Sequence, residues 1–157
     1  MRGENARTCA TSVTTQYIDI ALAKAQSDEQ RRRLTAMRAT AAAIEQLETD
    51  LPAHLERNRE RRGEPARTLS KAAKQQVDSS DEAAQRQHLL QLRYCNRAAD
   101  AAEAVRAIAE YHSNDLQAWV MIFELLENAE DRAVYAQVIE NKRALLRELR
   151  AFLRHAR

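Results

Sequence analysis

The clearest structural signal in the chain comes from residues 128–155, which read NAEDRAVYAQVIENKRALLRELRAFLRH. Apolar side chains recur here every three or four residues, the period that places side chains on one face of an α-helix. About three residues in seven are apolar, as in the helices of a globular bundle. This apolar face consists of Tyr135, Val138, Leu145, Leu149 and Phe152 and, beside them, Ile139, Leu146 and Leu153.

Polar residues at the start and in the middle of this segment refine the predicted helix. Asn128 marks a break before the helix, and Glu130 and Asp131 in its first turn favour the positive end of the helix dipole. Lys142 falls on the apolar face. We expect its methylene stem to pack against neighbours while its amine reaches water.

Residues 28–50 show a second strong helical pattern with a seven-residue repeat. Such a seam indicates packing of one helix along another. Glu48 interrupts the repeat. The two heptad positions are occupied by Met37, Ile44 and Leu51 and by Leu34, Ala41 and Leu55.

Short polar motifs predict where the early helices begin and end. Thr14 or Thr15 can cap the first helix, and Ser27 with Gln30 forms a capping-box pattern before the second. Pro52 removes a backbone donor, so we expect a new helix capped by Asp50, with a kink in one continuous helix as the alternative. Gly63 is expected to end this region as a C′ residue.

The middle of the chain predicts two further helices. Ser79 and Glu82 form a capping-box pattern, from which a long helix would run to about His112. Residues 113–115, Ser-Asn-Asp, are then expected to stop one helix and start another. Residues 115–127 are apolar on nearly all sides, which predicts either the buried centre of the domain or a contact surface in an oligomer.

Composition supports the same fold class. The 157 residues are 45% apolar and include 30 Ala but only two Gly and two Pro, too few for the many turns of a β-sandwich or barrel. We predict an all-α fold, a helical bundle of about five or six helices with long antiparallel coiled-coil-like helices. Residues 1–13 would form a flexible N-terminal tail and 14–157 a single helical-bundle domain, with 63–66 as a candidate internal link.

Charge, cysteine content and hydropathy limit the environment of the protein. The net charge is only +2, so the whole chain lacks the strong basic excess of many nucleic-acid-binding proteins. The longest apolar run has six residues, 118–123, whereas a membrane span needs about 20. The N-terminus lacks a secretory signal, and Cys9 and Cys95 lie too far apart for a zinc motif. We therefore expect a cytoplasmic protein without a membrane span, with Cys95 as a small core residue.

Catalytic motifs are not apparent. The four histidines form no HExxH pattern, and the two glycines build neither a phosphate loop nor a dinucleotide fingerprint. Asp100 and Glu103 lie one helical turn apart and, with His112, are the candidates for a metal-binding or acid–base site inside the bundle. The structural interpretation of this pair is favoured, because no ligand histidine accompanies it. We therefore predict no catalytic residue, metal or cofactor, with a bundle enzyme or metal-binding protein as the second alternative.

Charge is distributed unevenly along the chain. Residues 54–74 contain seven basic and three acidic residues, for a net charge of +4, and residues 141–157 have a net charge of +5. Residues 103–130 have a net charge of −5. The basic segments either bind nucleic acid or pair with the acidic helices, and we favour internal pairing. A nucleic-acid-associated regulator using segment 57–74 is the first alternative function, with Arg57, Arg59, Arg61, Arg62 and Arg67 as its binding residues.

The heptad seams and the apolar segment 115–127 support a leading hypothesis. We predict a non-enzymatic helical protein–protein interaction module: an adaptor, regulator or subunit of a larger assembly. Its partner would be another protein or further copies of the same chain. The predicted contact residues are Trp119, Ile122, Phe123, Leu126, Leu146 and Leu153.

Overall fold

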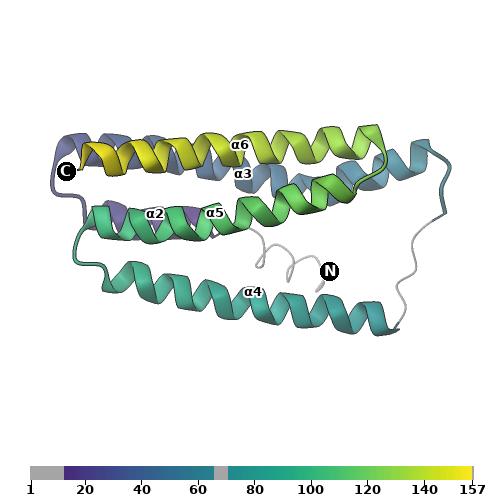
Figure 1. Ribbon diagram of the computed structural model, residues 1–157, viewed down its shortest axis with the longest axis horizontal. Coiled ribbons are helices and arrows are strands. Elements are labelled where there is room, and N and C mark those ends of the chain that lie inside the picture. The colour runs from purple at the N-terminus through teal and green to yellow at the C-terminus, as the bar shows by residue number, and fades with distance from the viewer. Residues whose placement is uncertain (1–12, 66–70, 157) are drawn as a thin grey trace.

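The computed structural model describes residues 13–65 and 71–156, and these residues form five helices and no strand. This confirms the predicted all-α bundle (Figure 1). The helices are α2 (Thr14–Ala23), α3 (Asp28–Arg61), α4 (Lys71–Arg97), α5 (Ala101–Leu125) and α6 (Ala129–His155).

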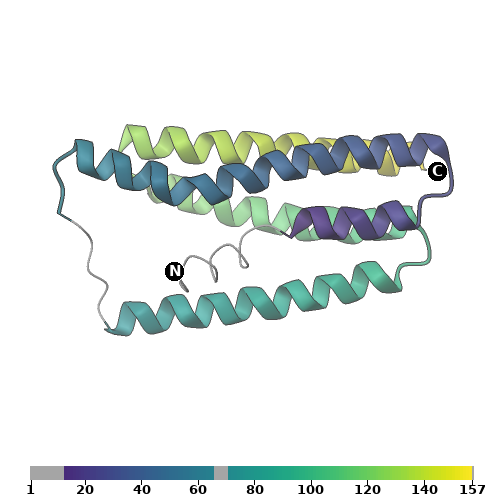
Figure 2. The same ribbon diagram turned by 180° about the vertical axis from the view of Figure 1, so that it is seen from behind.

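The two most extensive helix–helix interfaces of the bundle, α3 with α6 and α5 with α6, each join antiparallel helices. Helix α6 lies between α3 and α5, and the short α2 packs against α3 and the first half of α5 (Figures 1 and 2). Side-chain contacts between α3 and α6 fix the register, because residue numbers rise along one helix as they fall along the other. These contacts join Thr40 to Glu148, Glu48 to Lys142, and Asn58 to Asp131.

The core follows the predicted heptads. From Leu34 to Leu51 the buried positions of α3 are separated by three and four residues, and the charged Glu48 occupies one of them. The predicted heptad residue Leu55 is only partly buried. In α6 the predicted apolar face is buried against α3 and α5 except at Tyr135 and Leu153, which are partly buried, and the buried face includes Lys142. Alanines dominate the start of α5, and Cys95 of α4 is buried against them as a small core residue. The central core residues are Tyr17, Ile18, Leu34, Met37, Val105, Ile108, Leu145, Leu149 and Phe152.

Helix α3 is continuous through Pro52, which contradicts the predicted new helix capped by Asp50. The predicted cap at Ser27 is confirmed, since its hydroxyl oxygen accepts a hydrogen bond from the Gln30 amide at 3.1 Å. Beyond Pro52, Asn58 is buried and its side-chain amide donates to Asp131 of α6. Packing along α6 thus continues on both sides of the proline, and it outweighs the local loss of one backbone hydrogen bond.

Helix α3 ends where the sequence predicted, at Gly63. This residue has a φ of +72°, a conformation that glycine adopts without the penalty of a side chain. The Gly63 amide donates to the Glu60 carbonyl and the Glu64 amide to the Arg59 carbonyl. These two bonds form a Schellman motif, which satisfies carbonyl groups at the end of the helix.

The predicted boundaries of the next two helices are wrong. Helix α4 passes through Ser79 without interruption and ends at Arg97, and α5 passes through residues 113–115. The actual break lies at residues 98–100, where Asp100 caps α5 by accepting from the Glu103 amide. Asp115 does not act as a cap because its carboxylate binds Lys142.

The start of the described chain differs from the prediction in one detail. Val13 precedes α2, is buried, and provides the carbonyl that accepts from Gln16 and Tyr17. Neither predicted threonine is the cap, and the Thr15 hydroxyl instead donates to Glu45 of α3. The rest of the predicted tail, residues 1–12, lies outside the described residues. Among the described helices, none has the length and hydropathy that crossing a membrane requires.

The exposed Pro52 provides a test of this continuous helix. We expect Pro52→Ala to raise the free energy of unfolding by about 2 kcal/mol, since alanine restores a backbone donor and is about 3 kcal/mol more favourable inside a helix, while proline restricts the unfolded chain by up to about 1 kcal/mol. Urea denaturation would measure this change. As a control, Ala39→Pro at an exposed position of the same helix should lower stability. A decrease for Pro52→Ala would show that the packing requires the proline.

Candidate functional site

The end of α5 carries a cluster of exposed aliphatic side chains. Met121, Ile122 and Leu125 are 67%, 44% and 82% exposed, and we call these three residues the α5 patch. The prediction that residues 115–127 form the buried centre of the domain is therefore wrong. The buried residues of α5 end at His112, because α2 packs beside the first half of α5 only (Figure 1).

The α5 patch continues the side of α5 that faces α4. Met121 follows Asn114 by seven residues, about two helical turns, and therefore lies on the same side of the helix. Asn114 and Asp115 face an open hollow of about 410 Å³ between the two helices. This hollow is lined by Val13, Ala84, Gln87, His88, Tyr111, Asn114 and Asp115.

A second hollow borders the α5 patch at the opposite side of Leu125. It is an open groove of about 650 Å³ at the end of the bundle, between α3, α5 and α6. Its wall combines aliphatic and aromatic side chains with charged side chains of both signs. Its lining includes Pro52, Leu55, Leu125, Leu126 and Tyr135 together with Glu56, Glu64, Glu127, Asp131, Arg59 and Arg62.

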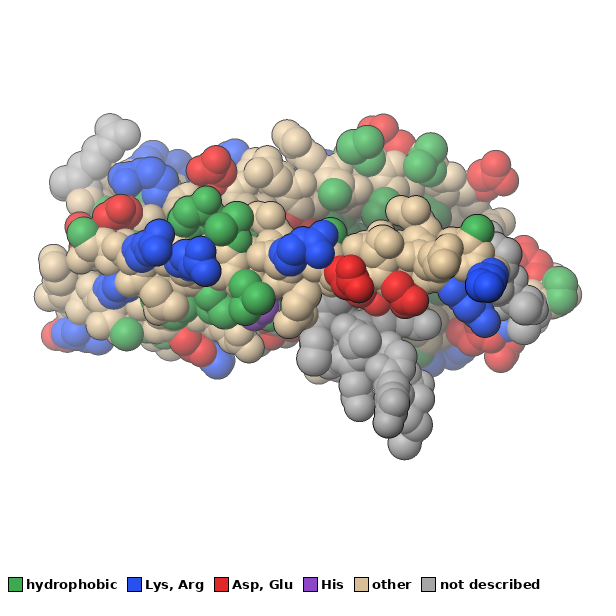
Figure 3. Space-filling model, turned by 90° about the horizontal axis from the view of Figure 1, so that it is seen from below, with side chains coloured by type: hydrophobic (Ala, Val, Ile, Leu, Met, Phe, Trp, Pro, Cys, Tyr) green, Lys and Arg blue, Asp and Glu red, His purple; other side chains and the backbone are tan. Residues whose placement is uncertain are grey.

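Figure 3 views the molecule from the side of α4. Hydrophobic side chains reach the surface along α4 and also farther back, where α5 runs, and acidic side chains accompany the latter group. On α4 the exposed hydrophobic residues are Leu89, Leu90 and Tyr94. The described surface thus presents two separate hydrophobic areas.

Three predicted contact residues have partners within the bundle. Trp119 packs on Tyr135 of α6, with ring centroids 5.5 Å apart. The Arg132 guanidinium lies 4.2 Å from the centre of the Phe123 ring. The same guanidinium donates to the backbone carbonyls of Phe123 and Leu126, so it holds the end of α5 against the start of α6.

The remaining predicted contact residues differ in accessibility. Leu146 is only 6% exposed and belongs to the α6 packing face, so a partner cannot reach it in the folded chain. Leu153 is partly buried and packs against the core. Ile122 is the only member of the predicted set among the large exposed hydrophobic residues of the described chain. Its neighbours Met121 and Leu125 were not singled out from the sequence.

Much of the basic segment 57–67 forms contacts within the bundle. Arg62 forms ion pairs with Glu64, Glu130 and Asp131, and these hydrogen-bonded carboxylates raise the pKa of its guanidinium. The contacts join the end of α3 to the start of α6. For Arg62 they are the predicted pairing of a basic segment with acidic residues of another helix. For Arg143, Arg150 and Arg154 of the second basic segment, no such pair is found within the described residues.

The other arginines of this segment have varied surroundings. Arg59 pairs with Glu56 and donates to the backbone carbonyl of Glu64. Arg57 lies 2.7 Å from the His54 Nδ1 atom, and Arg61 is exposed. Arg67 lies outside the described residues.

The candidate acid–base pair is a helix cap. The Asp100 carboxylate accepts from the Glu103 amide at 2.9 Å, and the Glu103 carboxylate accepts from the Ala99 amide at 2.8 Å. These reciprocal bonds satisfy backbone donors at the start of α5. His112 lies nearly three turns farther along the helix, so the three residues do not share one site. The described residues contain no cluster of three or more His, Cys, Asp or Glu side chains suited to a metal ion.

A buried ionic cluster lies at the centre of the bundle. The Lys142 ammonium of α6 pairs with Glu48 of α3 and, at 2.6 Å, with Asp115 of α5. It also lies 4.9 Å from the centre of the Trp119 ring. Lys142 is 3% exposed, so the expectation that its amine reaches water is wrong. Burial disfavours the charged amine, but the two carboxylates outweigh this effect and raise the pKa of Lys142.

His112 adjoins this cluster. Its Nε2 atom lies 3.0 Å from the Lys142 carbonyl, to which it donates, and this bond leaves Nδ1 as an acceptor. Nδ1 is buried and has no hydrogen-bond partner within the described chain. Burial and the nearby ammonium lower the pKa of His112, which keeps the imidazole neutral. A cavity of about 100 Å³ lies beside these groups, lined in part by Glu48, Tyr111, His112, Asp115, Trp119 and Lys142.

The sequence contains a signal for this cluster. Glu48 interrupts the heptads of α3, and Lys142 interrupts the apolar face of α6. Two opposite charges that each occupy a core position predict each other as partners, because an unpaired buried charge is strongly unfavourable. Asp115 does not interrupt an apolar repeat, so nothing in the sequence indicates that it belongs to the cluster.

Comparison of the chain with family models, curated proteins and solved structures gave no match.

The ionic cluster can be tested by changing one or all of its charges. We expect Lys142→Met to lower the free energy of unfolding by about 3–5 kcal/mol, because it leaves two carboxylates without their buried counter-ion. Combining it with Glu48→Gln and Asp115→Asn should recover much of this loss. Chemical denaturation of both variants, with exposed Lys74→Met as the matched control, would measure the effect. A loss below about 1 kcal/mol for the single variant would contradict the assigned role.

Two substitutions test whether Asp100 acts as a helix cap. Asp100→Ala should lower stability by about 1 kcal/mol, whereas Asp100→Asn should preserve most of it, since asparagine also caps helices. Thermal and urea unfolding would compare the two variants. If asparagine were as destabilising as alanine, the negative charge itself would be required.

Proposed function

We propose that this chain is a non-enzymatic protein-interaction module that binds an amphipathic helix of another protein on the α5 patch. The observation that carries this proposal is the exposure of Met121, Ile122 and Leu125 on one side of a helix whose first half is packed into the core. Clustered exposed hydrophobic side chains on a folded protein favour association.

The geometry of the α5 patch favours a helical partner. Its residues lie at intervals of three and four along α5, so they offer a ridge about one turn long. The groove at the end of the bundle borders this ridge at Leu125. The hollow toward α4 lies about two turns earlier along α5. An amphipathic helix recognises such a surface through hydrophobic anchors at the same spacing. Met121 adds a flexible side chain that adapts to its partner.

Charge around the α5 patch favours a basic partner. Glu124 and Glu127 flank Leu125 and are exposed. In the part of the chain that the structure describes, neither carboxylate forms an ion pair. Complementary charges at the rim of an interface increase the association rate and select the partner. The proposed partner helix therefore carries aliphatic residues on one face and Lys or Arg beside them.

Synthetic helical peptides would test this proposal. The probe is a basic amphipathic peptide with leucines on one face, compared with a sequence-scrambled peptide and with a version in which each Lys is replaced by Glu. Fluorescence anisotropy should show at least about tenfold tighter binding of the basic peptide. Met121→Gln with Leu125→Gln should weaken its binding by about tenfold or more.

A matched control distinguishes the two exposed hydrophobic areas. Leu89→Gln with Leu90→Gln on α4 removes the same kind of side chains and should leave peptide binding unchanged. Equal binding of the basic and acidic peptides, or loss of binding only in the α4 variant, would contradict the proposal. Sedimentation velocity of the free protein tests whether a second copy of this chain occupies the α5 patch instead. A dimer that is lost in the Met121/Leu125 variant would assign the α5 patch to a second copy and contradict the proposal.

A further inference from the structure

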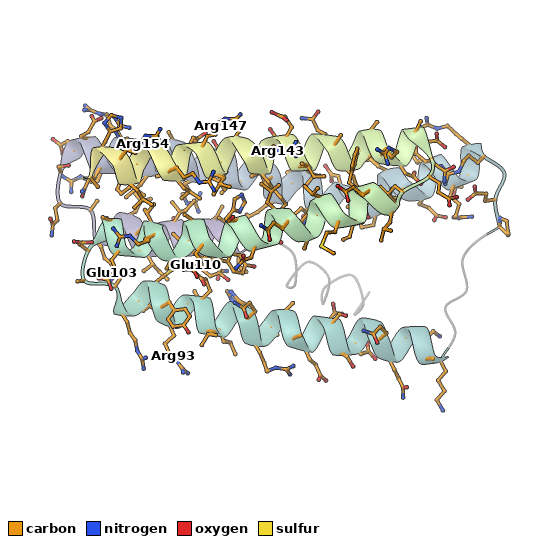
Figure 4. All side chains as sticks on the ribbon, viewed as in Figure 1. Arg93, Glu103, Glu110, Arg143, Arg147 and Arg154 are labelled. Atoms are coloured by element: carbon orange, nitrogen blue, oxygen red, sulfur yellow. The ribbon has the colours of Figure 1, made fainter. Side chains whose placement is uncertain are left out.

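Four arginines form a line along the outer side of α6. Arg143, Arg147, Arg150 and Arg154 are separated by four, three and four residues, which places them on one face of the helix. All four are exposed. The packing face of α6, which includes Leu145, lies on the opposite side. Figure 4 shows Arg143, Arg147 and Arg154 along α6. We call the four residues the α6 arginine row.

Within the described part of the chain, the α6 arginine row has few internal partners. Several arginines elsewhere pair with nearby carboxylates. Within residues 13–65 and 71–156, Arg147 alone in the row approaches a carboxylate, that of Glu140 at 3.9 Å. Both of these side chains are about two-thirds exposed, so water screens the pair. The paired arginines elsewhere are Arg31, Arg32, Arg33, Arg38, Arg59 and Arg62.

Acidic residues of the neighbouring helix do not neutralise the row. Glu103 and Glu110 of α5 lie on the side toward α4, away from α6 (Figure 4). Glu148, which belongs to α6 itself, bonds to Thr40 of α3. The row therefore presents four guanidinium groups to solvent over about 16 Å, the length of eleven residues of helix.

We propose that the α6 arginine row binds the phosphate backbone of duplex nucleic acid without reading its sequence. Guanidinium groups match phosphate oxygens in geometry and charge. A duplex offers a closely spaced series of phosphates to a straight row of cations, with one charge every 3.4 Å or so along each strand. Contacts of this kind determine position and affinity but not sequence preference.

The composition of this surface favours nucleic acid over a protein partner. Protein interfaces concentrate apolar side chains at their centre and exclude charge from it. The large apolar residues between the arginines are buried, except for the partly buried Leu153, and the other residues between them are alanines and Glu148. The buried ones are Leu145, Leu146, Leu149 and Phe152. Single strands are bound through exposed aromatic side chains that stack on bases, and the row does not offer them. A polar, positively charged surface is typical of contacts with a duplex.

The row replaces the segment that the sequence suggested for nucleic-acid binding. Arg59 and Arg62 of segment 57–67 are engaged in contacts inside the bundle. The row also lies apart from the α5 patch, because the register of α5 against α6 pairs Trp119 with Tyr135 and His112 with Lys142. The α5 patch is thus level with the start of α6, whereas the row occupies its second half. The two proposals are independent.

Binding to a fluorescent DNA duplex of about 20 base pairs tests the inference through its salt dependence. With four phosphate contacts, the slope of log K against log salt concentration should be about −3.6, a loss in affinity of about 150-fold between 50 and 200 mM salt. Arg143→Gln with Arg147→Gln should reduce the magnitude of the slope by about 2 and weaken binding at low salt. Circular dichroism verifies that the variant is folded.

A control variant distinguishes DNA binding by the α6 arginine row from DNA binding by any exposed arginine. Arg57→Gln with Arg61→Gln removes the same charge from exposed arginines of α3 and should leave the slope unchanged. Absence of binding at about 50 mM salt, or a loss in the α3 variant equal to that in the α6 variant, would overturn the inference. Binding to vesicles containing phosphatidylserine but not to DNA would assign the row to anionic lipid headgroups and would equally overturn it.

Discussion

One buried ammonium group ties three helices of this protein together. Lys142 projects from α6 and binds carboxylates of α3 and α5 at the same time, and its own backbone carbonyl accepts a hydrogen bond from His112. Hydrophobic contacts tolerate small shifts along a helix, whereas two charge-assisted bonds to one nitrogen fix both position and rotation. The cluster therefore selects one register for the α3–α6 and α5–α6 seams, and the surrounding core packs on the geometry that it sets.

That register also determines which surfaces remain for other molecules. The α6 side chains that face α3 and α5 are buried in the core, so the arginines of the α6 arginine row lie on the outer side of the helix. In α5, the packed half ends at His112 and Asp115 near the ionic cluster, and the following part of the helix, nearly three turns long, extends past α2. A basic surface and an apolar, acid-flanked surface thus occupy different halves of one rod-shaped bundle. If both proposals hold, this separation would leave room for the two partners at the same time.

The sequence predicted the periodic features well and the isolated ones poorly. The heptads around Met37 and Ile44, the C′ residue Gly63 and the face of α6 are repeated or chemically specific signals, and the structure confirms them. The helix boundary predicted at Asp50 failed because packing of α3 against α6 outweighs a local capping pattern. The boundary predicted at Ser79 failed in a stretch of α4 whose described side chains are exposed, so packing does not account for it. The exposure of Met121 and Leu125 was not predictable, since an apolar stretch has the same composition whether a neighbouring helix covers it or not. The pairing of Glu48 with Lys142 could have been predicted from the two apolar repeats that they interrupt, whereas the participation of Asp115 could not.

The antiparallel seam of α3 and α6 restricts how this protein can change in length during evolution. Inserting or deleting one residue between Leu34 and Glu48 would rotate one part of α3 by about 100° relative to the other, and Glu48 would leave the Lys142 ammonium. A change of seven residues returns the side chain to nearly the same face but moves it about 10 Å along the axis. Divergent descendants of this chain would therefore retain the spacing within α3 and α6 and vary in length at the connection that follows Gly63.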